Sequence, residues 1–306
     1  MDTSSTIAAD RRLSLLERAI YSTVAYRDIF QYPVTLTEIH RYLHRVRCTL
    51  DDVREAITRG PLADTLLEAD GTYFALRGRR ASFDVRRRRE ALTRDRWPTA
   101  LRFARFLATL PNVRMVAVTG SFAANNFAED GDIDFLLVSE AGSMWRTRAL
   151  GRVLSRLDEA IGRGLLCPNT VLSTAALPLP RQSLYDAQEL CQMIPLFGSA
   201  IYETVRTANA WTADWLPNAE GWPEGHVECV PYAPGLKLVG EWLLDSMAGR
   251  AIETFEAERK IRRFNETADF KEGWTRSTRE THSMWDGMRL KIERAWRERL
   301  AAIGHD

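Results

Sequence analysis

The segment from Val113 to Val138 constrains the fold of this chain more than any other, because it combines two strand patterns with a tight turn. The β-branched and apolar run that ends at Thr119 is typical of a buried strand, and Gly120 follows it directly. Residues 121–127 are rich in alanine and short polar side chains, which favours the start of a helix. Unpaired N–H groups at a helix start carry partial positive charge, and a glycine lets an anion approach them closely. We therefore expect an anion site at Gly120 and Ser121, with the serine hydroxyl as a further donor.

Two acids open the second strand pattern of this segment. Asp132 and Asp134 are two residues apart, and successive side chains of a strand alternate between its faces, so both carboxylates project on one side. Ile133 and Phe135 then point to the other side. Neighbouring carboxylates repel each other, and a divalent cation relieves the repulsion; magnesium prefers such hard oxygen ligands together with substrate phosphates. The alternative is an Asp- and Gly-rich turn that only caps a hairpin.

These features together resemble the signature of the polymerase-beta-like nucleotidyltransferase superfamily, over roughly residues 112–140. The resemblance implies a small mixed β-sheet flanked by helices. It implies that Gly120 and Ser121 hold the β- and γ-phosphates of a nucleoside triphosphate (NTP), and that Asp132 and Asp134 bind magnesium or manganese ions. Gly131 is a minor departure, since relatives often carry serine before the first acid.

A third carboxylate, which active relatives commonly carry on a later strand, has no counterpart in the expected position. After a helix predicted over residues 143–163, the next strand pattern, residues 169–173, contains no acid. Asp186 and Glu189 come later on a helical stretch, and we interpret them as part of a solvated helix face. Three alternatives stay open: an unusual base, water and metal in its place, or nucleotide binding without efficient turnover.

Composition narrows the class of protein. The chain has 306 residues and a formal net charge of +1, which allows two or three packed domains. It contains no apolar run of the roughly 20 residues that a membrane span needs and no hydrophobic signal core at its start, so we expect a cytoplasmic protein without a membrane partner. The cysteines are scattered without metal-ligand spacing and predict free thiols: Cys48, Cys167, Cys191 and Cys229.

The first 80 residues predict a separate small domain. Helical patterns over residues 14–29, 36–43 and 50–59 are followed by two short apolar runs around Asp70-Gly71, a strong hairpin signal. Thr35 and Glu38 have the spacing of a capping box. Three helices and a hairpin resemble a winged helix-turn-helix domain, whose third helix often enters a DNA groove. That helix carries three acids against two arginines here, which favours a protein-docking or structural role over DNA binding.

The remaining segments are predicted to be largely helical. Nine arginines between residues 77 and 96 indicate either a solvated helix or linker, or a stripe that binds phosphates. Residues 181–306 show helical spacing interrupted by prolines. The predicted organisation is a winged-helix-like domain (1–80), an Arg-rich helical linker (81–110), a nucleotidyltransferase-like core (111–180) and a helical C-terminal region (181–306).

The fold class predicted from these patterns is mixed α/β, of the α+β type. The expected chemistry is transfer of a nucleoside monophosphate from a metal-bound NTP to an acceptor hydroxyl, with release of pyrophosphate. The acceptor is open among small molecule, protein and nucleic acid, and the base of the NTP is not specified. The alternative is a catalytically weak or inactive domain that senses nucleotide or regulates through the winged helix.

Overall fold

Helices followed by a small hairpin form the N-terminal part of the chain, in a computed structural model that describes residues 13–223, 230–268, 277–282 and 286–301. The elements are α2 (Leu15–Asp28), α3 (Leu36–Arg41), α4 (Leu50–Arg59), α5 (Leu62–Thr65), β1 (Leu67–Ala69) and β2 (Phe74–Leu76). The capping box of Thr35 and Glu38 is confirmed, and Ser14 and Thr49 begin α2 and α4 in the same way. The order of elements is the one predicted, with the one-turn helix α5 added. The winged-helix resemblance itself stays a prediction.

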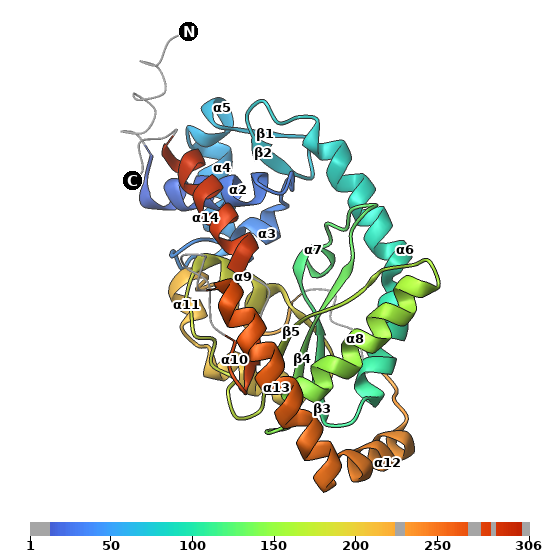
Figure 1. Cartoon of the computed structure of the whole chain (residues 1–306). Coiled ribbons are helices and arrows are strands. Elements are labelled where there is room, and N and C mark those ends of the chain that lie inside the picture. Colours follow the sequence, from blue (N-terminus) through green and yellow to red (C-terminus); the bar gives the residue numbers. More distant parts are fainter. Residues whose placement is uncertain (1–12, 224–229, 269–276, 283–285, 302–306) are drawn as a thin grey trace.

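The Arg-rich segment forms one continuous helix, α6 (Ser82–Thr109), which runs from the hairpin down beside the central sheet (Figure 1). Its first half packs on the N-terminal part, where buried Arg86 forms ion pairs with Glu38 at 2.9 Å and Glu90 at 2.6 Å. Phe103 and Leu107 in its second half belong to the core of the sheet domain. The helix therefore fastens both parts of the molecule to each other.

A five-stranded mixed sheet lies at the centre of the molecule. Its order is β6 (Ile194–Phe197), β3 (Val113–Val118), β4 (Ile133–Ser139), β5 (Leu166–Ser173) and β7 (Thr281–His282). β3 is antiparallel to β4, and β4 is parallel to β5 through the crossover helix α8 (Met144–Ala160). The predicted mixed α+β architecture, a small sheet flanked by helices, is confirmed. β6 and β7 come from the segment after residue 180, so the sheet extends into the region predicted as helical.

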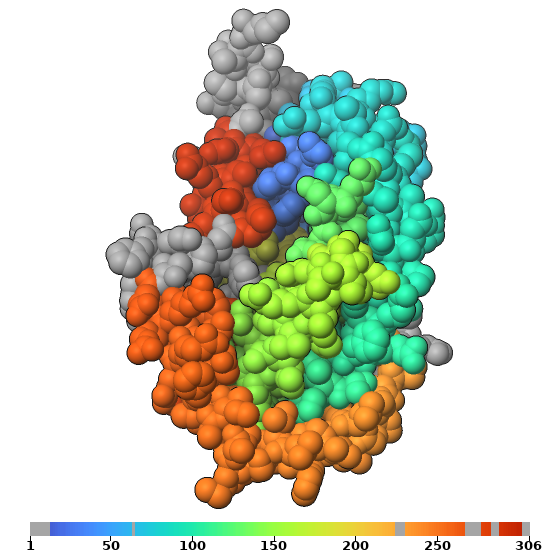
Figure 2. Space-filling model, turned by 45° about the vertical axis from the view of Figure 1, so that its right-hand side comes forward, coloured from blue at the N-terminus to red at the C-terminus, as the bar shows by residue number. Residues whose placement is uncertain are grey.

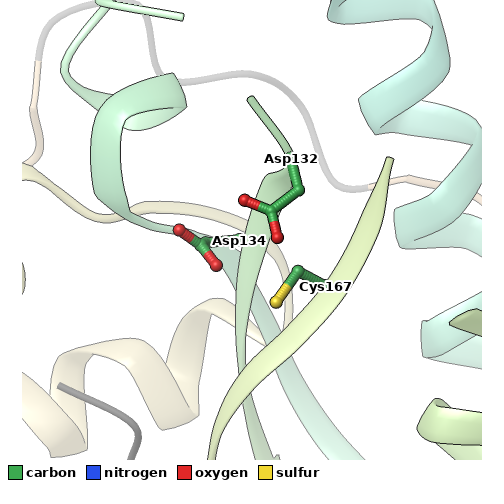
Figure 3. A group of neighbouring side chains, drawn as sticks. All are labelled: Asp132, Asp134 and Cys167. Carbon is green, nitrogen blue, oxygen red and sulfur yellow. The ribbon is translucent and has the colours of Figure 1, made fainter. Parts of the chain in front are cut away.

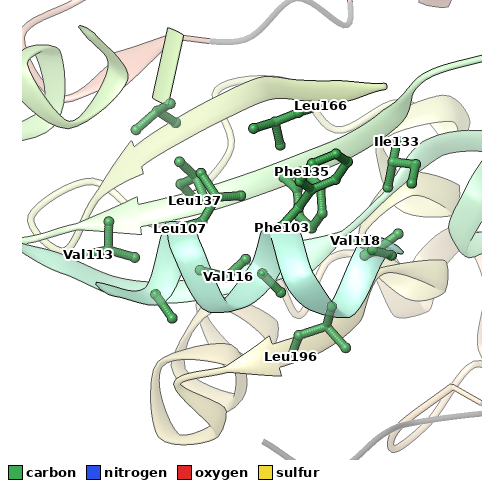
Figure 4. Close-up of a cluster of buried hydrophobic side chains, with 14 of the residues drawn as sticks. Phe103, Leu107, Val113, Val116, Val118, Ile133, Phe135, Leu137, Leu166 and Leu196 are labelled. Carbon is green, nitrogen blue, oxygen red and sulfur yellow. The ribbon is translucent and has the colours of Figure 1, made fainter. Parts of the chain in front are cut away.

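Both faces of this sheet are covered, and the strands alternate between two cores. Ile133, Phe135 and Leu137 of β4 point into the core that α6 covers (Figure 4). Leu136 and Val138 point into the other core, together with residues of the helices after β5. This alternation is what the period of two in the sequence requires. The face of Leu136 and Val138 is also the face of Asp132 and Asp134.

The helices of the C-terminal half are divided between the two cores, and the last of them returns to the N-terminal part. They are α9 (Leu184–Gln192), α10 (Ser199–Ala208), α11 (Thr212–Trp215), α12 (Pro234–Leu244), α13 (Met247–Ala268) and α14 (Asp286–Ala301). α14 lies beside α2 (Figure 1), where Trp296 donates to the carbonyl oxygen of Ser22 and Arg299 pairs with Asp28. In the part of the chain that the structure describes, every helix is too short or too polar to cross a membrane.

Candidate functional site

The turn at the end of β3 brings the backbone against the side chain of Asp134. Gly120 has φ +64°, and a Cβ atom at this position would lie 2.7 Å from Asp134 Oδ2. Glycine is therefore favoured here by its conformation, and any Cβ would force the Asp134 carboxylate to move. The helix that follows, α7 (Gly120–Ala123), has four residues and is shorter than the sequence predicts. It ends early because Asn125 adopts a left-handed conformation, with φ 56°.

Asp132 and Asp134 lie together at the start of β4, on the face that the sequence predicts. One ligand atom of each, and the sulfur of Cys167, lie within 4.8 Å of one another (Figure 3). Cys167 reaches this position because β5 runs parallel to β4 and its Cα pairs with that of Asp134. The three side chains therefore offer two hard oxygen ligands and one soft sulfur ligand.

Asn169 is the fourth polar residue of this group. Its Nδ2 donates a hydrogen bond of 2.8 Å to Asp134 Oδ1. The register of β4 and β5 shifts here, so that Asn169 has no Cα partner between Pro168 and Thr170. Such an irregularity adds one residue to a strand and redirects its side chains. The strand beside the Asp pair thus presents a thiol and an amide to it, and β5 contains no acid.

The carboxyl group of Asp134 is easier to protonate than an ordinary aspartate. Burial and then the charge of Asp132 raise its pKa to about 6, although hydrogen bonds from Asn169 and Cys167 act in the opposite direction. Burial and the two neighbouring carboxylates also raise the pKa of the Cys167 thiol. A metal cation would reverse both effects, because it stabilises the deprotonated forms of its ligands.

Glu189 lies at the same site, contrary to the interpretation of Asp186 and Glu189 as a solvated face. Every residue of α9 is buried, since this helix is enclosed between the sheet and the N-terminal part, and only 6% of Glu189 is exposed. The N–H of Gly120 donates to Glu189 Oε2 at 3.1 Å, and Gln192 Nε2 donates to Oε1 at 3.0 Å. Burial, followed by the charge of Asp134, raises the pKa of Glu189 to about 8.

The Gly-Ser turn, the Asp pair and Glu189 line one cavity of about 310 Å³, and Cys167 and Asn169 lie next to the Asp pair. Gly120, Ser121 and the Asp pair form one side, and Glu189 belongs to the wall that α9 contributes. The remaining wall comes from α2 and the residues after it: Tyr26, Arg27, Phe30 and Tyr32. Figure 2 shows a hollow bordered by the blue N-terminal part, the green core and the red helix α14. The structure therefore brings all four residues predicted from the sequence, Gly120, Ser121, Asp132 and Asp134, to one cavity.

Cys167, Asn169, Glu189 and Arg27 are the cavity and cluster residues that sequence reasoning missed. Cys48, Cys167 and Cys191 are free, and Cys229 lies outside the described residues. The sequence predicts a strand from Asn169, whereas β5 begins three residues earlier at Leu166 and therefore includes Cys167. An earlier strand start would have placed it beside Asp134 by parallel pairing.

Comparison with known families agrees with this geometry. Residues 101–163 match a family model described as a nucleotidyltransferase domain, which includes the Gly-Ser turn and both aspartates but ends before Cys167. The match supports assignment of this part of the chain to the nucleotidyltransferase superfamily, with nucleotidyl transfer as the general activity. No curated protein and no solved structure shows a significant match to the chain.

Proposed function

We propose that this protein transfers a nucleoside monophosphate from a metal-bound NTP to an acceptor hydroxyl. The acceptor oxygen forms a bond to the α-phosphorus, the bond from that phosphorus to the bridging oxygen breaks, and pyrophosphate leaves. The observation that carries the proposal is the shared cavity of Gly120, Ser121, Asp132 and Asp134. A phosphate oxygen at the Gly120 N–H would take the place that Glu189 Oε2 occupies in the present structure.

The donor set fits a divalent cation, held by Asp132 and Asp134. Because Gly120 has no Cβ atom, the Asp134 carboxylate can lie against the backbone of the turn, where it can bind the ion. When bound, such an ion neutralises charge at the α-phosphate and lowers the pKa of the attacking hydroxyl. Magnesium would use the two carboxylates and substrate phosphates, whereas the Cys167 thiolate suits softer cations.

Glu189 is the acid to which we assign the proton of the acceptor hydroxyl. Among the described residues, Glu189 is the only acid besides the Asp pair that lines the cavity of the Gly-Ser turn. A pKa raised to about 8 suits a group that gains and loses a proton near neutral pH. Glu189 would thereby supply from α9 the carboxylate that β5 lacks.

Titration of each of the four NTPs by calorimetry, with Mg²⁺ or Mn²⁺ and then with chelator, tests the proposal. We expect one or more NTPs to bind only with metal, and the double variant Asp132→Asn, Asp134→Asn to lose this binding while keeping its circular dichroism spectrum. Asp130→Asn, an exposed acid in the same loop, is the matched control and should bind like the wild type. Equal NTP binding by the double variant and the control would remove the Asp pair from the site.

Cys167→Ser should change the metal preference of the site. Because sulfur favours soft cations, we expect the affinity for Cd²⁺ to fall at least about tenfold and that for Mg²⁺ to change by less than about twofold. The ultraviolet absorption of a cadmium thiolate reports on the sulfur directly. Cys48→Ser, in the N-terminal part, should keep both affinities and the absorption. An unchanged cadmium signal in Cys167→Ser would show that this sulfur is not a ligand.

A nucleotide-binding protein without turnover is a second candidate, favoured by the thiol and amide that β5, which contains no acid, presents to the Asp pair. Metal-dependent NTP binding without pyrophosphate release, over a range of acceptors, would support it. Its regulatory version needs a partner for the N-terminal part. DNA is disfavoured, because Arg54 and Arg59 on α4 form ion pairs with Asp51 and Glu55 of the same helix.

A further inference from the structure

Arg27, at the end of α2, is a buried cation in the wall of the cavity that contains the Asp pair. Only 5% of the surface of Arg27 is exposed. Its Nη1 donates to Gln192 Oε1 at 3.3 Å and its Nη2 to Gln188 Oε1 at 2.7 Å, so both acceptors are neutral amides. In the described part of the chain no carboxylate lies within ion-pair distance of this guanidinium, and its Nε has no hydrogen-bond partner.

A buried charge without an ion-pair partner is costly. The rings of Tyr42 and Tyr32, with centroids 4.6 and 5.6 Å from the guanidinium carbon, offset part of this cost. The nearest acid in sequence, Asp28, pairs with Arg79 and Arg299 instead. Glu38 and Glu189 interact with Arg27 through space, but in the described part of the chain neither carboxylate lies within ion-pair distance, so the guanidinium can still accept an anionic ligand.

Arg41 of α3 is half-buried, and it too has no ion-pair partner among the described residues. Arg41 and Arg27 both line a second cavity of about 130 Å³ that shares Arg27, Tyr32, Ala124 and Gln192 with the larger one. Arg41 donates to the carbonyl oxygens of Glu220 and Gly221, and its Nε is buried without a partner. Glu38 also lines this cavity, but it is already engaged with Arg86.

The two adjoining cavities are thus electrically polar. Asp132 and Asp134 lie at the end formed by β4. Arg27 and Arg41, which have no ion-pair partner among the described residues, lie at the end formed by α2 and α3, where Glu38 is paired with Arg86. Residues 123–125, which follow the Gly-Ser turn directly, line the arginine end. A ligand that carries a metal-bound phosphate and a second anionic group would match both ends.

We propose that Arg27 and Arg41 form a binding subsite for a phosphate-type oxyanion of the substrate. The N-terminal part then completes the transferase cavity and is more than an appended domain. The ligand's identity rests on the proposed function, but the anion subsite does not require turnover. The oxyanion belongs either to the terminal phosphates of the nucleotide or to an acidic group on the acceptor.

Calorimetric titration with inorganic triphosphate and inorganic phosphate, without metal, tests the subsite. Charged hydrogen bonds are worth enough that Arg27→Gln and Arg41→Gln should each weaken binding at least about tenfold. Arg54→Gln, an exposed arginine on α4 outside both cavities, is the control and should bind like the wild type. Arg27→Gln should also raise the melting temperature, because it removes a buried unpaired charge, so misfolding is excluded by the same samples.

The other outcomes have distinct meanings. Retention of metal-free triphosphate binding by the Asp132→Asn, Asp134→Asn variant would show that the subsite is independent of the metal site and survives failure of the proposed function. If Arg27→Gln also weakens metal-dependent NTP binding, the oxyanion is the nucleotide's; if it weakens only metal-free anion binding, the oxyanion is the acceptor's. Equal anion binding by Arg27→Gln, Arg41→Gln and Arg54→Gln would overturn the proposal.

Discussion

Glu189→Gln is expected to raise the free energy of unfolding at pH 9 by about 4 kcal/mol over the wild type. The pKa of Glu189 is raised from an ordinary 4.5 to about 8, so the folded state binds the proton more tightly than the unfolded state does. The stability that this proton contributes is complete below pH 4.5 and is lost as pH rises through 8. Glutamine escapes this loss, which is worth about 5 kcal/mol. Its amide nitrogen cannot accept one of the two hydrogen bonds that Glu189 accepts from the Gly120 N–H and Gln192 Nε2, which costs about 1 kcal/mol.

Denaturant unfolding of both proteins between pH 4 and pH 9 measures the difference. The variant should be about 1 kcal/mol less stable than the wild type near pH 4, gain stability relative to it between pH 4.5 and pH 8, and stay about 4 kcal/mol more stable above that. Glu203→Gln, an exposed acid on α10, is the control and should follow the wild type at every pH. A Glu189→Gln curve that also follows the wild type would mean that Glu189 is solvated and is not a buried wall residue of the cavity.

The same variant separates stability from function. If Glu189 accepts the proton of the acceptor hydroxyl, its turnover should fall at least about tenfold while its stability rises. An ordinary core residue would not combine these two changes. A variant that is more stable and fully active would assign the proton to water instead.

Local patterns explain how much of this site could be predicted from the sequence. Asp132 and Asp134 share a face because side chains alternate along the short strand β4. Gly120 is recognisable as a turn residue because it follows the apolar run of β3. The capping box of Thr35 and Glu38 is equally local. Each of these features depends on residues that are close in the chain.

Features that depend on packing between distant segments could not be predicted in this way. Cys167 reaches Asp134 only through parallel pairing of β4 and β5, and Asn169 only through a register shift between them. Glu189 is buried because α9 is enclosed on all sides. The sequence contains one indication of this, since apolar residues occur all around the helix: Leu184, Tyr185, Ala187, Leu190 and Cys191. Arg27 joins the cavity from a segment more than 90 residues away from the Gly-Ser turn.

Gly120→Ala is expected to disable the metal site at a modest cost in stability. The φ of +64° at this residue forces alanine into a left-handed conformation, which costs about 1–2 kcal/mol. The added Cβ would also lie 2.7 Å from Asp134 Oδ2, so the carboxylate has to move away from Asp132 and Cys167. Because small displacements of reacting groups are expensive, we expect turnover to fall about 100-fold and Mn²⁺ binding to weaken.

Gly142→Ala separates the two consequences of this change. Gly142 has φ +71° and no atom within 4 Å of an added Cβ, so its alanine variant carries the backbone strain alone. Both variants should lose similar stability in denaturant unfolding, but only Gly120→Ala should lose Mn²⁺ affinity by calorimetry. Equal metal binding by the two variants would show that Asp134 accommodates the methyl group, and that glycine is needed here for its conformation and not for the space beside the carboxylate.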